Sequence, residues 1–309
     1  MLSRPLLRFV RDDRQIRFMR GRYAGLIVSA VLSIASVLLF FTPGLNLGLD
    51  FRGGIIVETH SPSPEDPAHM RALLEKAQID TASVQSFGSP NDIRIAINLP
   101  HGPNAEHQTQ QLVDHVKQAI TASEPGTQIQ RADAVGGSVS SELFRDGILA
   151  LVCSLGMILV YIWFRFEREF ALSAVITLVL DLTKTIGFLV ITRFEFDLVM
   201  VAALLTILGY STNDKVVVYD RVRENLKKYR TMPLQELLDL SINETLNRTL
   251  GTSMTVFLAA LPLALFGGST LTGFATVMLF GIVVGTSSSI FIAAPLLLLM
   301  GKKRLRRAN

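Results

Sequence analysis

The sequence has little of the chemistry on which most enzymes depend. Its 309 residues include one cysteine and one tryptophan, and its five histidines all lie between positions 60 and 115. The single cysteine, Cys153, excludes a disulfide within the chain, and inside an apolar run it is ordinarily a packing residue. No histidine has a spacing to a cysteine or to another histidine that is typical of a metal site. We see no nucleophile beside a base and no paired catalytic carboxylates, so we predict no enzyme, no metal and no cofactor.

Charge is scarce in six long stretches of the chain. Each of these apolar runs is about as long as the ~20 helical residues that cross a hydrocarbon core ~30 Å thick. Only helices and closed barrels satisfy their backbone groups in lipid, and continuous apolar runs indicate helices. We therefore predict a multi-span α-helical membrane protein with six transmembrane helices. The runs are Ala24–Phe41, Ile148–Phe164, Phe170–Ile191, Leu198–Val218, Leu250–Phe266 and Leu271–Met300.

Positive charge gathers in four places, all on one side of the membrane if six spans alternate. It precedes the first run, follows the last, and fills the links between runs two and three and between runs four and five. Such charge marks the cytoplasmic side, so we predict an inner (cytoplasmic) membrane protein with both termini in the cytoplasm. The arginine-rich start could suggest RNA binding, but topology explains the net charge of +4 without nucleic acid. The first run exceeds a signal core and lacks a cleavage site, which indicates an uncleaved anchor.

The polar block between the first two runs is the only soluble region of size. Its pattern predicts the order β-α-β-β-α-β, which is that of a small α+β, ferredoxin-like domain outside the cytoplasm. This fold carries many functions and indicates none by itself. The expected elements are Gly54–Glu58, Pro67–Gln78, Ala82–Phe87, Ile93–Leu99, Ala105–Ile120 and Thr127–Val135, with Ser89–Asp92 as a turn.

We predict five regions along the chain. They are a basic cytoplasmic N-terminus at 1–23, the first transmembrane helix at 24–42, a periplasmic domain at 43–142, transmembrane helices two to six at 143–300, and a basic cytoplasmic tail at 301–309. A cytoplasmic link at 219–247 joins spans four and five. Apolar residues at helical spacing in this link predict an amphipathic helix on the membrane surface; they are Leu234, Leu237, Leu238 and Ile242.

The fourth apolar run is interrupted by Asn213, Asp214 and Lys215, after which three valines resume it. A charge inside a span costs ~2.5–3.5 kcal/mol on insertion scales, so such a residue is rarely without a function. The alternative is that Asp214 reaches headgroups and water at the cytoplasmic edge. Tyr210 and Asn213 belong to a polar stripe at helical spacing, which in lipid must face protein or water. The other members of the stripe are Thr206 and Gly209.

Two further charged sites lie in the spans. Arg248 stands at the cytoplasmic start of the fifth run, at a depth within ~3 Å of that of Asp214. Opposite charges at one depth on successive helices predict an ion pair, although Arg248 alone could simply extend to the headgroups. Asp181 and Lys184, three residues apart in the third run, either neutralise each other or belong to an ion pathway.

Glycine residues occur in two further motifs. The segment Gly48–Gly54 follows the first run, and its paired Gly53 and Gly54 suit a tight exit from the membrane. Asp50 and Arg52 in this segment are either solvated or brace the soluble domain. In the sixth run a ridge of small residues four apart permits close approach of helices. This ridge consists of Gly281, Gly285, Ser289 and Ala293.

These segments resemble, in order and over nearly the whole chain, the motifs of the SecF family. Its members are subunits of the bacterial SecD–SecF protein-export complex, within the resistance-nodulation-division superfamily. The resembling segments are Gly48–Gly54, Gly209–Asn225, Asn243–Ser253 and Phe266–Phe291. The resemblance implies a SecD partner, the SecYEG channel, unfolded preproteins as substrates and use of the proton-motive force. It further implies contacts with YajC and a membrane insertase, and proton flow through Asp214 and Arg248.

The sequence also departs from the family pattern. Lys215 stands where a small polar residue is usual, and Thr212 replaces an aliphatic residue. Lys184 adds a cation to the third span. A lysine beside Asp214 could hold that carboxylate ionised, but at i+1 it points roughly 100° away. Serines replace part of a glycine-containing entry to the second span; they are Ser138, Ser140 and Ser141.

Two other classes of protein are possible. A half-size, proton-driven exporter of small molecules or lipids from the same superfamily would share the spans, but such exporters usually carry two larger outer domains. An intramembrane enzyme would need a nucleophile with a base, or metal ligands, within the spans. The sequence favours an accessory, non-enzymatic subunit of protein export, and its six runs suggest half of a twelve-span machine.

Overall fold

The computed structural model describes residues 15–301, except 80, 88, 99–104 and 125. It divides the chain into two compact units. The helical unit comprises the residues up to 45, 150–194 and those from 199 onward, and the α+β unit comprises 46–149 and 195–198. Most of the basic residues predicted at the two ends lie at 1–14 and 302–309, outside the described residues.

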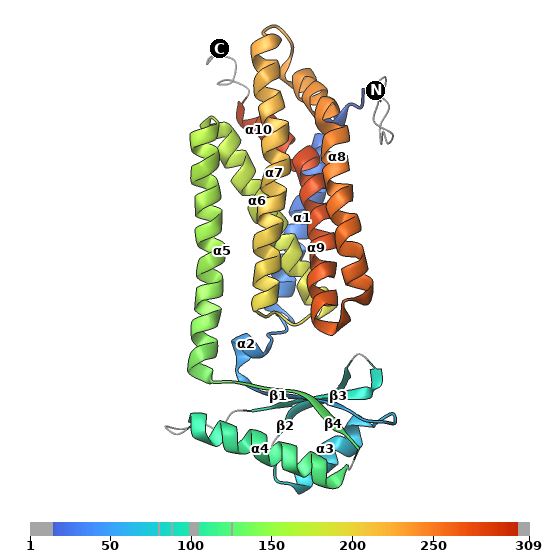
Figure 1. Cartoon of the computed structure of the whole chain (residues 1–309). Helices are drawn as coiled ribbons and strands as arrows, with labels where there is room; N and C mark the ends of the chain where they lie inside the picture. Colours follow the sequence, from blue (N-terminus) through green and yellow to red (C-terminus); the bar gives the residue numbers. More distant parts are fainter. Residues whose placement is uncertain (1–14, 80, 88, 99–104, 125, 302–309) are drawn as a thin grey trace, which may run out of the picture. The chain divides into compact units, whose positions relative to one another are not determined.

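The α+β unit is a four-stranded antiparallel sheet with strand order β2-β3-β1-β4. Helices α3 and α4 lie on the same face of this sheet (Figure 1). The predicted order of strands and helices is confirmed. The elements are α2 (Leu49–Arg52), β1 (Gly54–His60), α3 (Pro67–Lys76), β2 (Thr81–Phe87), β3 (Ser89–Ile97), α4 (Ala105–Ser123) and β4 (Gln128–Val135).

Alternation along the strands builds the core of this unit. Ile55 and Val57 of β1 stand opposite Ile97 and Ile95 of β3, and all four side chains are buried. The apolar faces of the two helices cover them. Helix α3 begins where expected, because the side chain of Asp66 accepts a hydrogen bond from the amide of Ala68 and a proline follows at the first helical position.

The predicted turn at Ser89–Asp92 is wrong, since these residues belong to β3. The segment after β1 supplies donors that keep them extended: the amide of Ser61 donates to the carbonyl of Asn91 at 2.9 Å, and the amide of Glu65 donates to the carbonyl of Pro90 at 3.1 Å. A proline is tolerated near the start of a strand because its missing N–H leaves no ladder bond unmade there.

The helical unit is built from long helices. Five described segments are long and apolar enough to cross a membrane: Phe18–Phe41, Gly137–Arg165, Arg168–Thr192, Leu234–Phe266 and Leu271–Gly301. The expected fourth span, now within α7, is not among them, because the polar stretch Ser211–Lys215 interrupts its apolar run. The elements are η1 (Phe18–Gly21), α1 (Arg22–Phe41), α5 (Gly137–Arg165), α6 (Arg168–Thr192), α7 (Leu198–Lys228), α8 (Leu234–Phe266), α9 (Gly268–Ser288), the π-helix η2 (Ser289–Ala293) and α10 (Ala294–Gly301).

The link predicted at 219–247 is not a separate surface helix. Helix α7 runs on to Lys228, and α8 begins at Leu234 and continues without a break to Phe266. The predicted membrane-facing side chains are instead buried in a cluster with Met19, Phe170 and Tyr219. They face protein because apolar residues of η1, α6, α7 and α10 pack in the same cluster. At this end Arg221 of α7 also pairs with Glu244 of α8 at 2.7 Å.

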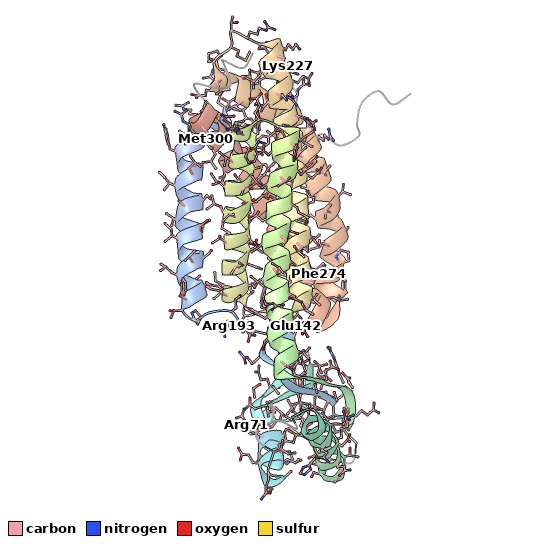
Figure 2. The ribbon with its side chains drawn as sticks, turned by 90° about the vertical axis from the view of Figure 1, so that its left-hand side faces the viewer. Arg71, Glu142, Arg193, Lys227, Phe274 and Met300 are labelled. Atoms are coloured by element: carbon pink, nitrogen blue, oxygen red, sulfur yellow. The ribbon has the colours of Figure 1, made fainter. Side chains whose placement is uncertain are left out.

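Small residues set the spacing of the central helices. A Cβ added at Gly281 of α9 would lie 2.4 Å from Cδ1 of Ile207, and one at Gly285 would lie 3.0 Å from Ser211, both on α7. Figure 2 places Lys227 and Met300 at one end of the helical unit and Arg193 and Phe274 at the other. Gly281 and Gly285 of the predicted ridge therefore pack against α7 of the same chain, whereas the carbonyl of Ala293 accepts a hydrogen bond from Ser173 of α6.

Candidate functional site

Asp181 of α6 is the centre of a buried polar cluster. Its Oδ1 lies 3.3 Å from Nζ of Lys184, the partner predicted on the same helix. Its Oδ2 lies 3.1 Å from Nζ of Lys215, which comes from α7 and is wholly buried. The same oxygen accepts hydrogen bonds from the hydroxyls of Ser211 at 3.0 Å and Ser288 at 2.5 Å. Three helical segments thus meet at one carboxylate.

Lys215 is the donor in each of its side-chain hydrogen bonds in this cluster. Its ammonium group donates to Oγ of Ser211 at 2.5 Å and to Oγ of Ser288 at 3.2 Å, as well as to Asp181. Both serine hydroxyls in turn donate to Asp181. Every contact of Nζ is an acceptor, which suits an ammonium group because that group has three donors and no lone pair. The geometry is that of a charged lysine on an ionised Asp181.

Asp214 has a different environment, although it lies beside Lys215 in sequence and is 1% exposed. Its Oδ2 accepts a hydrogen bond from Oγ1 of Thr286 on α9 at 3.3 Å. Thr286 lies 2.7 Å from Oγ of Ser253 on α8, and Ser253 accepts from the hydroxyl of Tyr210 at 2.7 Å. Because Tyr210 is only half-buried, this chain of hydroxyls leads from near the surface of the unit to the buried carboxylate.

The predicted ion pair between Asp214 and Arg248 is not formed. Arg248 is exposed on α8, and within the described part of the chain neither residue forms an ion pair with the other. The residue spacing predicts how deep Arg248 lies along the helix axis. It does not predict the direction in which its side chain points around that axis. Asn213 is exposed too, as are Thr206 and Gly209 of the predicted polar stripe.

The junction segment lies entirely within the α+β unit. The amide of Gly48 donates to the carbonyl of Phe196 at 2.9 Å, and Oδ2 of Asp50 accepts from the amide of Leu198 at 3.1 Å. Leu198 is the first residue of α7, so Asp50 satisfies a free amide at a helix start. Gly53 and Gly54 have φ angles of 71° and 133°, which L side chains rarely adopt.

The second charged residue of the segment, Arg52, fits the other alternative, that of a solvated side chain. Arg52 is exposed. The cation that reaches the link between α6 and α7 is Arg94 of β3, which lies 2.6 Å from Glu195 and 2.8 Å from Glu58. Carboxylates on both sides of Arg94 tie this link to the sheet. The sequence did not indicate the contact between Arg94 and Glu195, because a strand pattern does not show which distant loop lies beside a given strand residue.

Two family descriptions match the sequence. The C-terminal region of the protein export membrane proteins SecD and SecF matches residues 115–303, and the SecD/SecF GG motif matches residues 38–60. The chain belongs to the SecD/SecF family. The role that this membership supports is that of an accessory subunit in protein translocation.

Individual relatives agree with the SecD/SecF assignment. Protein translocase subunit SecF of Rhodobacter capsulatus is 40% identical over 96% of this chain and 92% of the relative. That of Rickettsia bellii is 38% identical over 97% of this chain and 98% of the relative. The structure of SecDF from Thermus thermophilus, described as a translocon-associated membrane protein, matches with a TM-score of 0.82 and 29% identity. The match covers 96% of this chain and 40% of the SecDF chain, so this chain spans less than half of that protein.

The GG-motif match contains the junction, and the C-terminal match contains the buried cluster. Sequence reasoning found Asp181, Asp214 and Tyr210 but missed the hydroxyls that connect them to other helices. The one available signal was the four-residue spacing of Ser211 and Lys215, which places both on one face of α7. The remaining partners come from α8 and α9, namely Ser253, Thr286 and Ser288.

One group in the α+β unit has the composition of a metal site, although no metal was predicted. Ligand atoms of Glu65, His69 and Glu124 lie within 4.8 Å of one another. Two features argue for an ordinary surface cluster: the side chain of His69 is 62% exposed, and its Nδ1 lies 3.6 Å from Glu124 as in a weak ion pair. The hydroxyl of Ser61 already occupies one oxygen of Glu65.

Proposed function

We propose that this chain is the SecF-type subunit of a bacterial Sec translocase in the inner membrane. With a SecD subunit it uses the proton-motive force to promote and complete the export of unfolded preproteins through the SecYEG channel. Family membership supports the export role. The observation that carries the proton coupling is the buried carboxyl of Asp214, reached by hydroxyls from the half-buried Tyr210.

In this proposal α7 also crosses the membrane, as the fourth span in chain order, which brings the number of spans to six. Both termini are cytoplasmic, and the α+β unit is a ferredoxin-like periplasmic domain. Helix α7 has 31 residues, more than the ~20 that a span requires. Four residues of its polar stretch are buried within the chain and do not face lipid, namely Ser211, Thr212, Asp214 and Lys215, whereas Asn213 is exposed. The positive-inside rule sets the orientation, with Lys227 and the basic tail in the cytoplasm.

A proton carrier must be charged in one state and neutral in another. Asp214 fits this requirement because one weak hydrogen bond, of 3.3 Å, holds its anion. We propose that Arg248 pairs with Asp214 in a second conformation, and that the separated pair seen here is the state open to proton uptake from the periplasm. Each proton that crosses 100 mV releases ~2.3 kcal/mol, enough to bias a two-state machine.

The partner follows from the surface of α7. Thr206, Gly209 and Asn213 are exposed although they lie along a helix that must sit in lipid. A polar stripe in a membrane faces protein or water, so a second chain is needed to cover it. We propose that SecD covers this stripe. Contacts with YajC and a membrane insertase are part of the same proposal and rest on the resemblance alone.

The test is export in membrane vesicles that contain the full chain, SecD and the channel. Completion of preprotein export is measured with and without a proton gradient. Asp214→Asn imitates the neutral carboxyl and should remove the stimulation by the gradient, which we expect to fall to the level of vesicles without SecD. Asp220→Asn is the matched control, because Asp220 lies on the same helix but has a side chain that is 44% exposed and paired with Arg165. Full stimulation in Asp214→Asn would show that another group carries the proton.

A further inference from the structure

The four charged side chains buried in the described chain form a balanced set. They are Asp181, Lys184, Asp214 and Lys215, with exposures of 1%, 8%, 1% and 0%. All four lie on two neighbouring helices, α6 and α7. A buried charge costs several kcal/mol unless an opposite charge compensates it. Two acids and two bases give a net charge of zero when all four are ionised.

The pairing within the set is uneven. Asp181 faces two ammonium groups, at 3.3 Å and 3.1 Å, and one carboxylate neutralises only one of them. The cluster of Asp181, Lys184 and Lys215 thus carries one excess positive charge. Asp214 is the only other buried acid in the described residues and follows Tyr210 by one helical turn. The side chains that α8 and α9 add to the set are hydroxyls, and Arg248 is exposed.

We infer that Lys215 is the positioning residue of the proton site: it is the countercharge that Asp181 and Asp214 share, and it links proton occupancy of Asp214 to the contact of α7 with α6 and α9. This inference rests on the proposed function and adds the residue through which the site acts. When Asp214 is ionised, the set is neutral. When Asp214 binds a proton, one positive charge is left over in a low-dielectric interior.

The excess positive charge lies where α7 contacts α9. Lys215 holds Ser211 of its own helix and Ser288 of α9 at 2.5 Å and 3.2 Å, and both serines also donate to Asp181. Ser288 ends α9 and directly precedes the π-helix η2, where the regular hydrogen-bond ladder changes. Single π-turns within helices are frequent at functional sites. A change in the negative charge that compensates Lys215 therefore acts where α7 meets the last span.

The experiment follows the protonated-carboxyl band of Asp214 by infrared spectroscopy. The full chain is reconstituted in lipid vesicles and titrated from about pH 4 to 9, and the band is assigned by its loss in Asp214→Asn. Lys215→Gln should move the pH of half-loss upward by about one unit or more, because the anion loses its countercharge. Asp181→Asn should move this pH downward, because the positive charge of Lys215 is then compensated by Asp214 alone.

The opposite signs separate this role from a structural one. Loss of packing would move the band in the same direction in both variants, and that result would overturn the inference. Lys215→Arg keeps the charge and should stay within about 0.3 pH units of the wild type. If the single variants misfold, the double variant Asp181→Asn/Lys215→Gln removes one charge of each sign and should return the midpoint to that of the wild type.

The same titration distinguishes this inference from the proposed function. A wild-type band that titrates, with an unchanged midpoint in Lys215→Gln, overturns the role of Lys215 and leaves Asp214 as the carrier. The absence of any titrating Asp214 band in the wild type overturns both. Vesicle export is not needed for either result, so a failure to reconstitute the translocase does not affect this test.

Discussion

Asp181 and Asp214 carry the same side chain, lie on neighbouring helices, and are each 1% exposed. Asp181 has two lysines and two serine hydroxyls within hydrogen-bond or ion-pair distance, at 2.5–3.3 Å. Asp214 has one threonine hydroxyl at 3.3 Å. Their exposed fractions are equal, so the partners are what distinguishes the two carboxyl groups here.

This difference separates a fixed charge from an exchangeable one. A buried carboxylate that accepts several charge-assisted hydrogen bonds has no reason to take up a proton, because each bond favours the anion. A buried carboxylate with one long hydrogen bond is held far less firmly in its charged form. Asp181 therefore suits a permanent connection between α6, α7 and α9, and Asp214 suits a group that changes state.

The largest expected effect comes from removing the permanent connection. Asp181→Ala leaves Lys184 and Lys215 buried without an acid between them. Breaking a buried ion pair by removing one partner typically costs ~3–5 kcal/mol, and we expect a loss of this size in the free energy of unfolding. The measurement is unfolding of the purified chain in mixed micelles by titration with a denaturing detergent.

Asp214→Ala is the matched control on the neighbouring helix. It removes one hydroxyl contact, which is worth ~0.5–1.5 kcal/mol, so it should destabilise the chain much less. Replacing both members of the pair with apolar residues, as in Asp181→Leu/Lys215→Met, should recover most of the loss. Equal losses in Asp181→Ala and Asp214→Ala would contradict the distinction between the two carboxyl groups.

Much of the fold could be predicted because its signals are local. Apolar runs of about twenty residues became α1, α5, α6, α8 and α9–α10, and strand alternation produced the β-α-β-β-α-β order. The errors arose where contacts with residues distant in the sequence decide the structure of a segment. Ser89–Asp92 reads as a turn, yet donors from the segment after β1 hold it extended. The apolar face at Leu234–Ile242 reads as membrane-facing, yet it is buried in a cluster with residues of η1, α6, α7 and α10.

The candidate site could be predicted only in part, for the same reason. The pair of Asp181 and Lys184 follows from their spacing on one helix, and it forms at 3.3 Å. The contact of Lys215 with Asp181 does not, because it depends on how α6 and α7 are rotated about their own axes. Rotation also explains Arg248: residues at equal depth can face opposite directions, and this arginine faces outward.

The second prediction disturbs the Asp181 cluster without changing its charge. A Cβ added at Gly285 would meet Cβ and Oγ of Ser211 at 3.0 Å, and Ser211 donates to Asp181 and accepts from Lys215. Overpacking of this kind costs ~1–3 kcal/mol, so we expect Gly285→Ala to destabilise the chain by that amount. The same detergent titration measures it.

Gly209→Ala is the control for helix propensity. Gly209 lies on α7 with open space around its Cα, so alanine should be neutral or stabilising there by up to ~1 kcal/mol. An unchanged stability in Gly285→Ala would mean that Ser211 can shift without loss, and that its bonds to Asp181 and Lys215 are not tightly constrained.

The smallest effect is expected in the α+β unit, at a carboxyl group close to water. Asp92 of β3 is 24% exposed at its side chain, and its oxygens lie 2.6 Å from Nδ1 of His60 and 2.7 Å from Oγ of Ser89. The hydrogen bond with His60, followed by that from Ser89, lowers the pKa of Asp92 below its usual value of 3.8. Because the folded pKa is the lower one, the stabilisation is fully present above pH ~4 and is lost as the pH falls through the folded pKa.

Asp92→Asn should therefore weaken β1 and β3 at neutral pH and make no difference in strong acid. The readout is hydrogen exchange of the amides near His60 and Asp92 in the full chain, compared between wild type and variant at each pH. An exposed pair is worth ~0.2–1 kcal/mol, so the protection of these amides should fall by no more than about fivefold at neutral pH. Asp133→Asn is the control, because Asp133 lies on β4 and pairs with Arg131 at the surface. A difference that grew on acidification would reverse the sign argued here and would mean that protonated Asp92 is the form that the fold prefers.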